Sequence, residues 1–268
     1  MATTALSMIQ EYYNDIIYNQ SDPRVRGWPL MDSPLPVLII GVLYYFFIRH
    51  AGPKFMEKRA PYKLERAMVY YNTLQVIVNS FAVYQGIRII LHPSYNLSCS
   101  PVTYETTPFH MKTTYLSWIY FAVKITDLVD TVFMVLRKNF HQVTFLHVYH
   151  HLGMAWGSWV VVKYIPGAHL CFVGLINCIV HSVMYFYYLL TAYDPTVKKS
   201  IWWKKHITEL QMTQFFLIFL HHLSALINPS CNYPKIALLV FLSQNFLMFY
   251  LFSKFYYQNY IKPRNKIN

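Results

Sequence analysis

The sequence predicts an all-α integral membrane protein whose helices cross the bilayer several times. Of its 268 residues, 55% are hydrophobic and only 13% are charged, whereas soluble domains carry about a quarter charged residues. The apolar residues form long runs, and a helix needs roughly 20 of them to cross a bilayer. The net charge of +12 comes from lysines and arginines clustered between these runs. That distribution is typical of membrane proteins and gives no reason to expect a nucleic-acid partner.

The apolar runs predict seven transmembrane helices joined by short connections. The short connections favour one bundle, with a lumenal N-terminal segment at 1–33, a membrane domain at 34–257 and a cytosolic tail at 258–268. The first thirty residues contain no apolar core of a signal peptide, so no cleavable one is expected. The predicted spans are 34–50, 67–91, 115–136, 142–164, 168–190, 207–227 and 235–257.

The distribution of basic residues predicts the orientation of the spans. Lysines and arginines gather in 51–66, 137–141, 191–206 and the tail after 257. Since cytosolic loops carry the excess of these residues, the N-terminus is expected in the lumen and the C-terminus in the cytosol. The final "RNKIN" loosely matches a dilysine-type retrieval signal of the endoplasmic reticulum.

Two kinds of residue in the non-cytosolic segments agree with this orientation. The sequons at Asn19 and Asn96 are candidate glycosylation sites there. Cys99 and Cys231 fall in two loops of the same side, so a lumenal disulfide between them is expected, with free thiols as the alternative.

The span 115–136 contains "KITDLVDT", with Lys124, Asp127, Asp130 and Thr131. In one continuous helix these side chains occupy about a third of the circumference. Lys124 and Asp127 stand three residues apart and can form an ion pair. Ionisable residues at membrane depth usually serve function; the alternative is a self-neutralised pair that only orients the bundle.

The span 142–164 contains "QVTFLHVYHH", with His147, His150 and His151 at spacings i, i+3 and i+4. These three imidazoles share one helical face, and Gln142 precedes them near the cytosolic end. Packing alone would require many hydrogen-bond partners inside the bilayer, so the pattern favours a functional site.

The next two spans repeat this arrangement of polar groups on one face. In 168–190, Asn177 and His181 are four residues apart, in a stripe shared with Met184, Tyr185 and Tyr188. In 207–227, the face consists of Thr208, Gln211 and Gln214, whereas His221 and His222 near the far end are expected to touch the membrane interface.

Converting sequence position into depth at about 1.5 Å per residue places these groups in one column. The column opens to the cytosol and ends about halfway across, and the far half is expected to be almost wholly apolar. Arg137, Lys138, Lys204 and Lys205 would form a cationic mouth suited to phosphates. This shape suits an amphiphile with a polar head and a hydrocarbon tail, such as an acyl-coenzyme A.

Three classes of protein compete as explanations of the histidines: an iron enzyme, a receptor or transporter, and an acyltransferase. An HxxHH box can bind iron, as in membrane desaturases and hydroxylases, but those enzymes have three such boxes and this chain has one. A seven-helix receptor or transporter has no evident need of the box. In acyl transfer, an imidazole can attack an activated acyl group or act as a general base.

The four polar motifs, "KITDLVDT", "QVTFLHVYHH", "NCIVHSVMYFYY" and "TELQMTQ", resemble in order and spacing the signatures of the ELO family of very-long-chain fatty acid elongases. One departure is Asp127, where the family usually has Glu. The resemblance implies a six-helix barrel around an acyl-CoA tunnel, with a seventh helix outside. It also implies a condensing acyltransferase of the endoplasmic reticulum membrane, which converts long-chain acyl-CoA and malonyl-CoA to 3-oxoacyl-CoA, CO2 and CoA.

The resemblance also implies roles for individual residues. His150 would carry the acyl group, His181 would be a second reactive imidazole, and His147 and His151 would orient or deprotonate it, with Asp130 and Gln214 as orienting partners. No metal and no cofactor beyond the two substrates is implied. The partners are membrane lipid and other enzymes of the elongation cycle, and a homodimer is allowed. The residues expected to contact substrate are Lys124, Asp130, Arg137, Gln142, Asn177, Tyr187, Lys204, Thr208 and Gln211.

Overall fold

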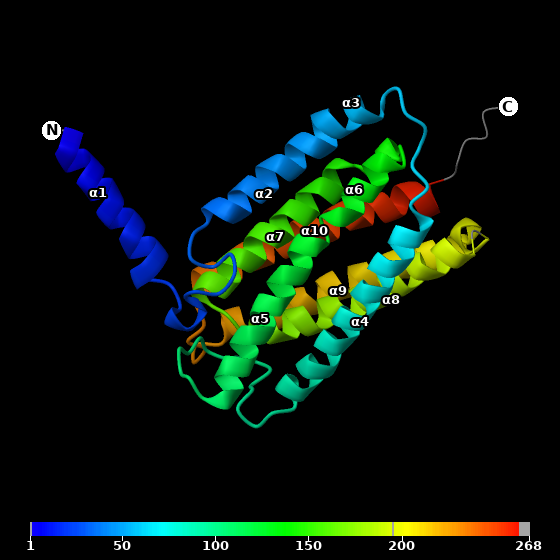
Figure 1. Ribbon diagram of the computed structural model, residues 1–268. Coiled ribbons are helices and arrows are strands. Elements are labelled where there is room, and N and C mark those ends of the chain that lie inside the picture. Colours follow the sequence, from blue (N-terminus) through cyan, green and yellow to red (C-terminus); the bar gives the residue numbers. More distant parts are fainter. Residues whose placement is uncertain (1, 195, 263–268) are drawn as a thin grey trace. The chain divides into compact units, whose positions relative to one another are not determined.

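The computed structural model describes residues 2–194 and 196–262, and every regular element in those ranges is helical (Figure 1). The predicted all-α class is therefore confirmed. The chain forms two compact units, the first from residues 2–63 and 102–168 and the second from 64–101 and 169–262. The terminal "RNKIN" motif lies outside the described residues.

A helix or a pair of helices occupies each predicted span. Four segments are long and apolar enough to cross a membrane, namely Leu35–Met56, Ala168–Tyr193, Ile201–Ile227 and Lys235–Ile261. The protein is thus a multi-pass membrane protein. The helices are α2 (Leu35–Phe46), continued by a π-helix (Phe47–Ala51) and α3 (Gly52–Met56), α4 (Glu65–Ile90), α5 (Pro108–Thr126), α6 (Val129–Leu136), α7 (Phe145–Tyr164), α8 (Leu170–Tyr193), α9 (Ile201–Ile227) and α10 (Lys235–Tyr256).

The third predicted span is not one continuous helix, which corrects the sequence prediction. It breaks at Asp127 and Leu128, between α5 and α6. The Leu128 N–H donates to the Ile125 carbonyl at 3.3 Å and the Asp130 N–H to that of Asp127 at 3.3 Å. These i→i−3 bonds tighten the backbone. Asp127 and Leu128 keep right-handed helical dihedral angles, so the helical spacing from residue 124 to 131 is tightened at this point rather than lost.

The N-terminal segment contains a helix that the sequence did not predict. This helix, α1 (Ala2–Asn14), continues into a π-helix at Asp15–Asn19. Figure 1 shows α1 projecting away from the other helices of its unit. A short 3-10 helix at Pro23–Val25 then leads the chain toward α2.

The first unit is held together by packing of α5 against α7 and of α2 and α3 against their neighbours. One apolar cluster surrounds Phe121 and Trp159. The indole N–H of Trp159 donates to the Leu30 carbonyl at 2.8 Å, which fixes the loop before α2. A second cluster joins α2, α6 and α7 through Tyr44, Val135, Val148 and their neighbours.

In the second unit, α4 and α8 pack along each other and α9 packs against both α8 and α10. Gly86 permits the close approach of α4 to α8, because a Cβ at this position would lie 3.0 Å from Cδ1 and 3.2 Å from Cβ of Leu175. Between α9 and α10, the buried Asn245 amide donates to the Phe215 carbonyl at 2.6 Å.

The cysteines and sequons have definite places in the structure. Cys99 and Cys231 form a disulfide within the second unit, which is the pairing expected from the sequence. Asn19 and Asn96 are both exposed. The Asn96 side-chain oxygen accepts hydrogen bonds from the backbone and the hydroxyl of Ser98, at 3.0 and 2.8 Å.

The expectation of an almost wholly apolar far half was wrong in both units. In the first unit Lys163 is fully buried, and its ammonium donates to the Met31 carbonyl at 2.8 Å. In the second unit His221 and His222 are buried, and they lie beside the buried His169. Helical spacing could not reveal these groups because their partners come from distant segments.

Candidate active site

In the first unit, the break between α5 and α6 carries a buried ion pair. The Lys124 ammonium lies 2.9 Å from the Asp127 carboxylate, and both side chains are almost fully buried. The ammonium also lies 4.9 Å from the centroid of the Tyr120 ring. The pairing expected from the sequence is thus present, and the carboxylate balances the charge of the lysine in an apolar environment.

Thr131 connects α6 to α2 and to the histidine helix. Its hydroxyl lies 2.7 Å from the Tyr44 hydroxyl and 2.8 Å from Nε2 of His147. Thr131 is fully buried, whereas Asp130 is half-buried. The residue at Nε2 of His147 is therefore Thr131, and Asp130 stays a predicted orienting partner of the histidines.

The three histidines of α7 lie together, as their spacing predicts. Thr144 is the N-cap of the helix, and its hydroxyl accepts a hydrogen bond from the His147 N–H. The His147 and His151 ring centroids are 4.2 Å apart, and those of His150 and His151 are 5.8 Å apart. All three side chains are half-buried. An imidazole in such a cluster can serve as a nucleophile or as a general base.

In the second unit, α8 carries the polar stripe predicted from sequence. Asn177 and His181 are buried, with 3% and 8% of their surface exposed. The His181 ring lies 5.8 Å from that of Tyr185. Tyr185 in turn contacts Tyr71 of α4, with 3.4 Å between the two hydroxyl oxygens.

A further polar stripe, not predicted from the sequence, lies on α4. Asn72, Gln75 and Asn79 are all buried in this helix. The Gln75 amide donates to the Tyr71 hydroxyl at 3.0 Å, and the Asn79 amide donates to the Gln75 carbonyl at 2.8 Å. The sequence contained a sign of this stripe, because three amides at spacings i, i+3 and i+7 mark one face of a helix within a predicted span.

The predicted face of α9 is also polar and buried. The Gln211 amide lies 3.8 Å from the Met184 sulfur of α8. The Thr208 hydroxyl donates to the carbonyl of Lys204, one turn earlier in its own helix. The buried Gln214 side-chain oxygen has no hydrogen-bond partner in the described part of the chain.

The residues predicted for the mouth have different environments. Tyr187 is buried and stacks on Trp203, with 6.0 Å between ring centroids. Arg137 and Lys204 are half-buried and Gln142 is exposed. Two further lysines of the expected mouth have other contacts: Lys138 donates to the Glu57 carbonyl at 3.2 Å, and Lys205 lies 3.8 Å from the Glu209 carboxylate.

The structure thus assembles the predicted residues into two polar groups, one in each unit. The first contains Lys124, Asp127, Thr131 and the histidines of α7; the second contains Asn177, His181, Thr208, Gln211 and Gln214. Within residues 2–194 and 196–262, the histidines of α7 do not form a set of three converging metal ligands; His169, His221 and His222 do. The first group therefore fits imidazole chemistry better than iron coordination.

Comparison with known proteins identifies relatives over nearly the whole chain. The sequence pattern of the GNS1/SUR4 family, abbreviated ELO, matches residues 29–268. The chain is 40% identical over 262 residues to very long chain fatty acid elongase 7 of Drosophila melanogaster, covering 97% of this chain and 79% of the relative. It is 40% identical to elongase 7 of Rattus norvegicus, covering 98% and 94%. Very long chain fatty acid elongase 1 of Homo sapiens is 37% identical, with 97% and 93% covered.

Proposed function

The chain belongs to the ELO family of GNS1/SUR4 proteins, and from this premise we propose that it is a condensing enzyme of fatty acid elongation. The reaction joins a long-chain acyl-CoA to malonyl-CoA and gives 3-oxoacyl-CoA, CO2 and CoA. The observation that carries the proposal is the family match over residues 29–268, within which the histidines of α7 lie together on one helical face.

The proposed reaction proceeds through an acyl-imidazole. A neutral ring nitrogen of His150 attacks the thioester carbonyl, the C–S bond breaks, and CoA leaves with a proton. Malonyl-CoA then loses CO2, and the resulting enolate attacks the acyl carbon and displaces the imidazole. Since the two CoA thioesters supply every reacting atom, the proposed reaction needs no further cofactor.

Neighbouring residues would position the nucleophile and stabilise charge. We assign His147 and His151 to orienting or deprotonating His150, and the hydrogen bond between Thr131 and His147 supports a fixed orientation for His147. His181 would be the second reactive imidazole. Asn177 or Lys124 would donate to the oxyanion formed when the thioester carbonyl is attacked.

The CoA arm would contact polar and cationic residues. Arg137 and Lys204 are half-buried, and their guanidinium and ammonium groups are of the kind that binds phosphates. Lys138, which donates to the Glu57 carbonyl, and Lys205, which lies near the Glu209 carboxylate, are further candidates. The remaining proposed contacts are Lys124, Asp130, Gln142, Tyr187, Thr208 and Gln211.

The number and orientation of the membrane spans, and the membrane in which they lie, are part of the same proposal. We place seven transmembrane helices in the 34–257 domain, six of them around an acyl-CoA tunnel, in the membrane of the endoplasmic reticulum. The N-terminal segment 1–33 would be lumenal and the tail 258–268 cytosolic, because the basic residues cluster on the opposite side from the sequons. Asn19 and Asn96 are then available for glycosylation, other elongation-cycle enzymes are expected partners, and a homodimer is allowed.

A di-iron desaturase or hydroxylase is the less favoured function. Such a site needs several imidazoles that converge on the metal ions. In the described residues, His147, His150 and His151 do not form such a group. Stoichiometric iron bound to these histidines in active protein would favour the oxygenase instead.

Substitution of the two reactive histidines tests the proposal. His150→Ala and His181→Ala should each reduce condensation to background, measured as 3-oxoacyl-CoA formed from acyl-CoA and malonyl-CoA. His92→Ala provides the control, because His92 is exposed in the loop after α4. Full activity in either variant would remove the role assigned to that histidine.

The covalent intermediate can be tested separately. Protein incubated with acyl-CoA alone should gain the mass of one acyl group on a peptide containing His150, and His150→Ala protein should not. Product formation from malonyl-CoA without any such adduct would favour direct attack, with histidine as the general base.

A further inference from the structure

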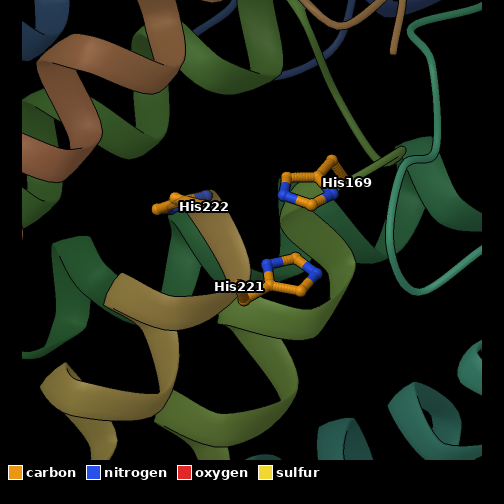
Figure 2. Close-up of side chains that lie close together, drawn as sticks. All are labelled: His169, His221 and His222. Atoms are coloured by element: carbon orange, nitrogen blue, oxygen red, sulfur yellow. The ribbon is translucent and has the colours of Figure 1, made fainter. Parts of the chain in front are cut away.

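A second histidine cluster lies in the second unit, apart from the residues assigned to condensation. His169 immediately precedes α8, and His221 and His222 lie in the last turns of α9 (Figure 2). The His169 ring is 3.8 Å from that of His221 and 5.5 Å from that of His222, measured between centroids. One ring nitrogen from each residue lies within 4.8 Å of the other two.

The nitrogens of this cluster lack the partners that buried polar atoms normally have. The exposed fractions of His169, His221 and His222 are 0%, 7% and 2%. Both nitrogens of His169, both of His221 and Nδ1 of His222 have no hydrogen-bond partner in the described part of the chain. Backbone groups of His221 and Leu97 come near the rings of His169 and His221, without normal hydrogen-bond geometry. Each buried polar atom without a hydrogen-bond partner destabilises the folded protein.

The groups around the cluster are aromatic. Phe172 lies 4.3 Å from the His221 ring, Phe241 lies 5.6 Å from that of His222, and Tyr233 lies 5.5 Å from that of His169. Such surroundings favour neutral imidazoles, which are the form that binds metal ions. Burial raises the pKa of the Tyr233 hydroxyl, so this group stays a neutral phenol. The Tyr233 oxygen also has no hydrogen-bond partner among the described residues.

We propose that His169, His221 and His222 form a binding site for one divalent transition-metal ion, with Zn2+ as the ion that suits the donor set. Three neutral imidazoles are an established ligand set for zinc, with water or hydroxide in the fourth position. Coordination would give one nitrogen of each ring the partner that the protein itself does not supply.

The arrangement of the three imidazole rings must change before they can bind a metal ion together. Figure 2 shows the His169 and His221 rings face to face, and their planes differ by 7°. Since an imidazole binds a metal ion in its own plane, one of these rings must rotate about its Cβ–Cγ bond. Zinc–nitrogen bonds of about 2.0–2.1 Å place ligand nitrogens roughly 3.3 Å apart, so the nitrogens need to move by on the order of 1 Å.

The ion would have a structural role separate from acyl transfer. It would join the start of α8 to the end of α9 close to the disulfide, because the His169 N–H donates to the carbonyl of Ser100, the neighbour of Cys99. The metal ion and the disulfide would then both cross-link helices and loops at the same end of the second unit. Metal binding at this site does not depend on the proposed condensation reaction.

Metal binding can be measured on the full chain, purified in detergent with a tag that contains no histidine. After removal of metals with a chelator, the protein should bind one Zn2+ per chain in competition with a chromophoric chelator. His169→Ala, His221→Ala and His222→Ala should each weaken binding about a hundredfold or more. His206→Ala should bind as the wild type does, because His206 is exposed at the opposite end of α9.

Two further measurements decide the result if an alanine variant folds poorly. Zn2+ should raise the midpoint of thermal unfolding of the wild type, because a ligand of the folded state stabilises it, and His221→Asn should abolish the rise. Co2+ in the wild type should give the intense visible bands of a four-coordinate, nitrogen-rich site. Wild-type protein that binds no more Zn2+ than His221→Asn would overturn the proposal. So would loss of the metal on substitution of His150 and its retention on substitution of His221.

Discussion

The hydroxyl of Thr131 lies 2.8 Å from Nε2 of His147 and joins the histidine cluster of α7 to the α5–α6 segment. The same hydroxyl contacts the Tyr44 hydroxyl at 2.7 Å, so three helical segments meet at one buried oxygen. This contact fixes the orientation of an imidazole next to the proposed nucleophile. We therefore propose that Thr131 is a positioning residue.

Removing this hydroxyl should lower the rate of condensation without preventing folding. Thr131→Val keeps the shape of the side chain but leaves His147 and Tyr44 without their shared partner, at a cost of about 1–3 kcal/mol. We expect kcat to fall about tenfold or more, because a misoriented imidazole would raise the activation barrier, and about 1.4 kcal/mol of barrier corresponds to one factor of ten. Thr131→Ser should retain most of the activity, and KM for acyl-CoA should change little in either variant. Equal kcat values for the two variants would contradict the positioning role.

The Lys124–Asp127 pair should respond differently to single and double substitution. Lys124→Met leaves a buried carboxylate without its cation, which destabilises a protein by about 3–5 kcal/mol. Lys124→Met combined with Asp127→Leu removes both charges and should recover most of the thermal stability. The measurement is the unfolding midpoint of the detergent-solubilised variants.

Activity of the same double variant distinguishes the two roles considered for the pair. If Lys124 contacts substrate or the oxyanion, the stable double variant should remain inactive. Recovery of both stability and activity would mean that the pair only orients the bundle. Asp127→Glu, the residue usual in the family motif, should keep both properties.

Close packing of α4 against α8 depends on the absence of a side chain at Gly86. Gly86→Val would place its Cβ 3.0–3.2 Å from atoms of Leu175, so the helices must separate or Leu175 must move. Overpacking of this kind costs about 1–3 kcal/mol. Leu175→Ala in the same chain should recover part of the loss in unfolding midpoint. Additive effects of the two substitutions would show that the contact does not couple them.

The disulfide should contribute strongly to the stability of the second unit. Cys99 and Cys231 are 132 residues apart, so the bond closes a long loop of the unfolded chain. Cys99→Ser with Cys231→Ser should lower stability by about 2–5 kcal/mol and abolish the mobility shift on reduction in gel electrophoresis. Cys171→Ser provides the control, because Cys171 is a free thiol.

The sequence alone determined the helices and the local histidine pattern, because both depend on spacing within one segment. Apolar runs placed a helix at every predicted span, and the HxxHH spacing put His147, His150 and His151 on one face of α7. The break at Asp127 was missed, because the hydrogen bonds that tighten the backbone there leave no mark on the apolar pattern.

The tertiary structure alone decided which distant side chains meet. Thr131 with Tyr44, Lys163 with the Met31 carbonyl, and His169 with His221 are contacts between segments far apart in the chain. Periodicity specifies the face of a helix that a residue occupies, but the neighbour on that face is set by how helices pack. The same reason applies to Tyr71 of α4: its bond with Gln75 lies within one helix, but its contact with Tyr185 of α8 was not visible in the sequence.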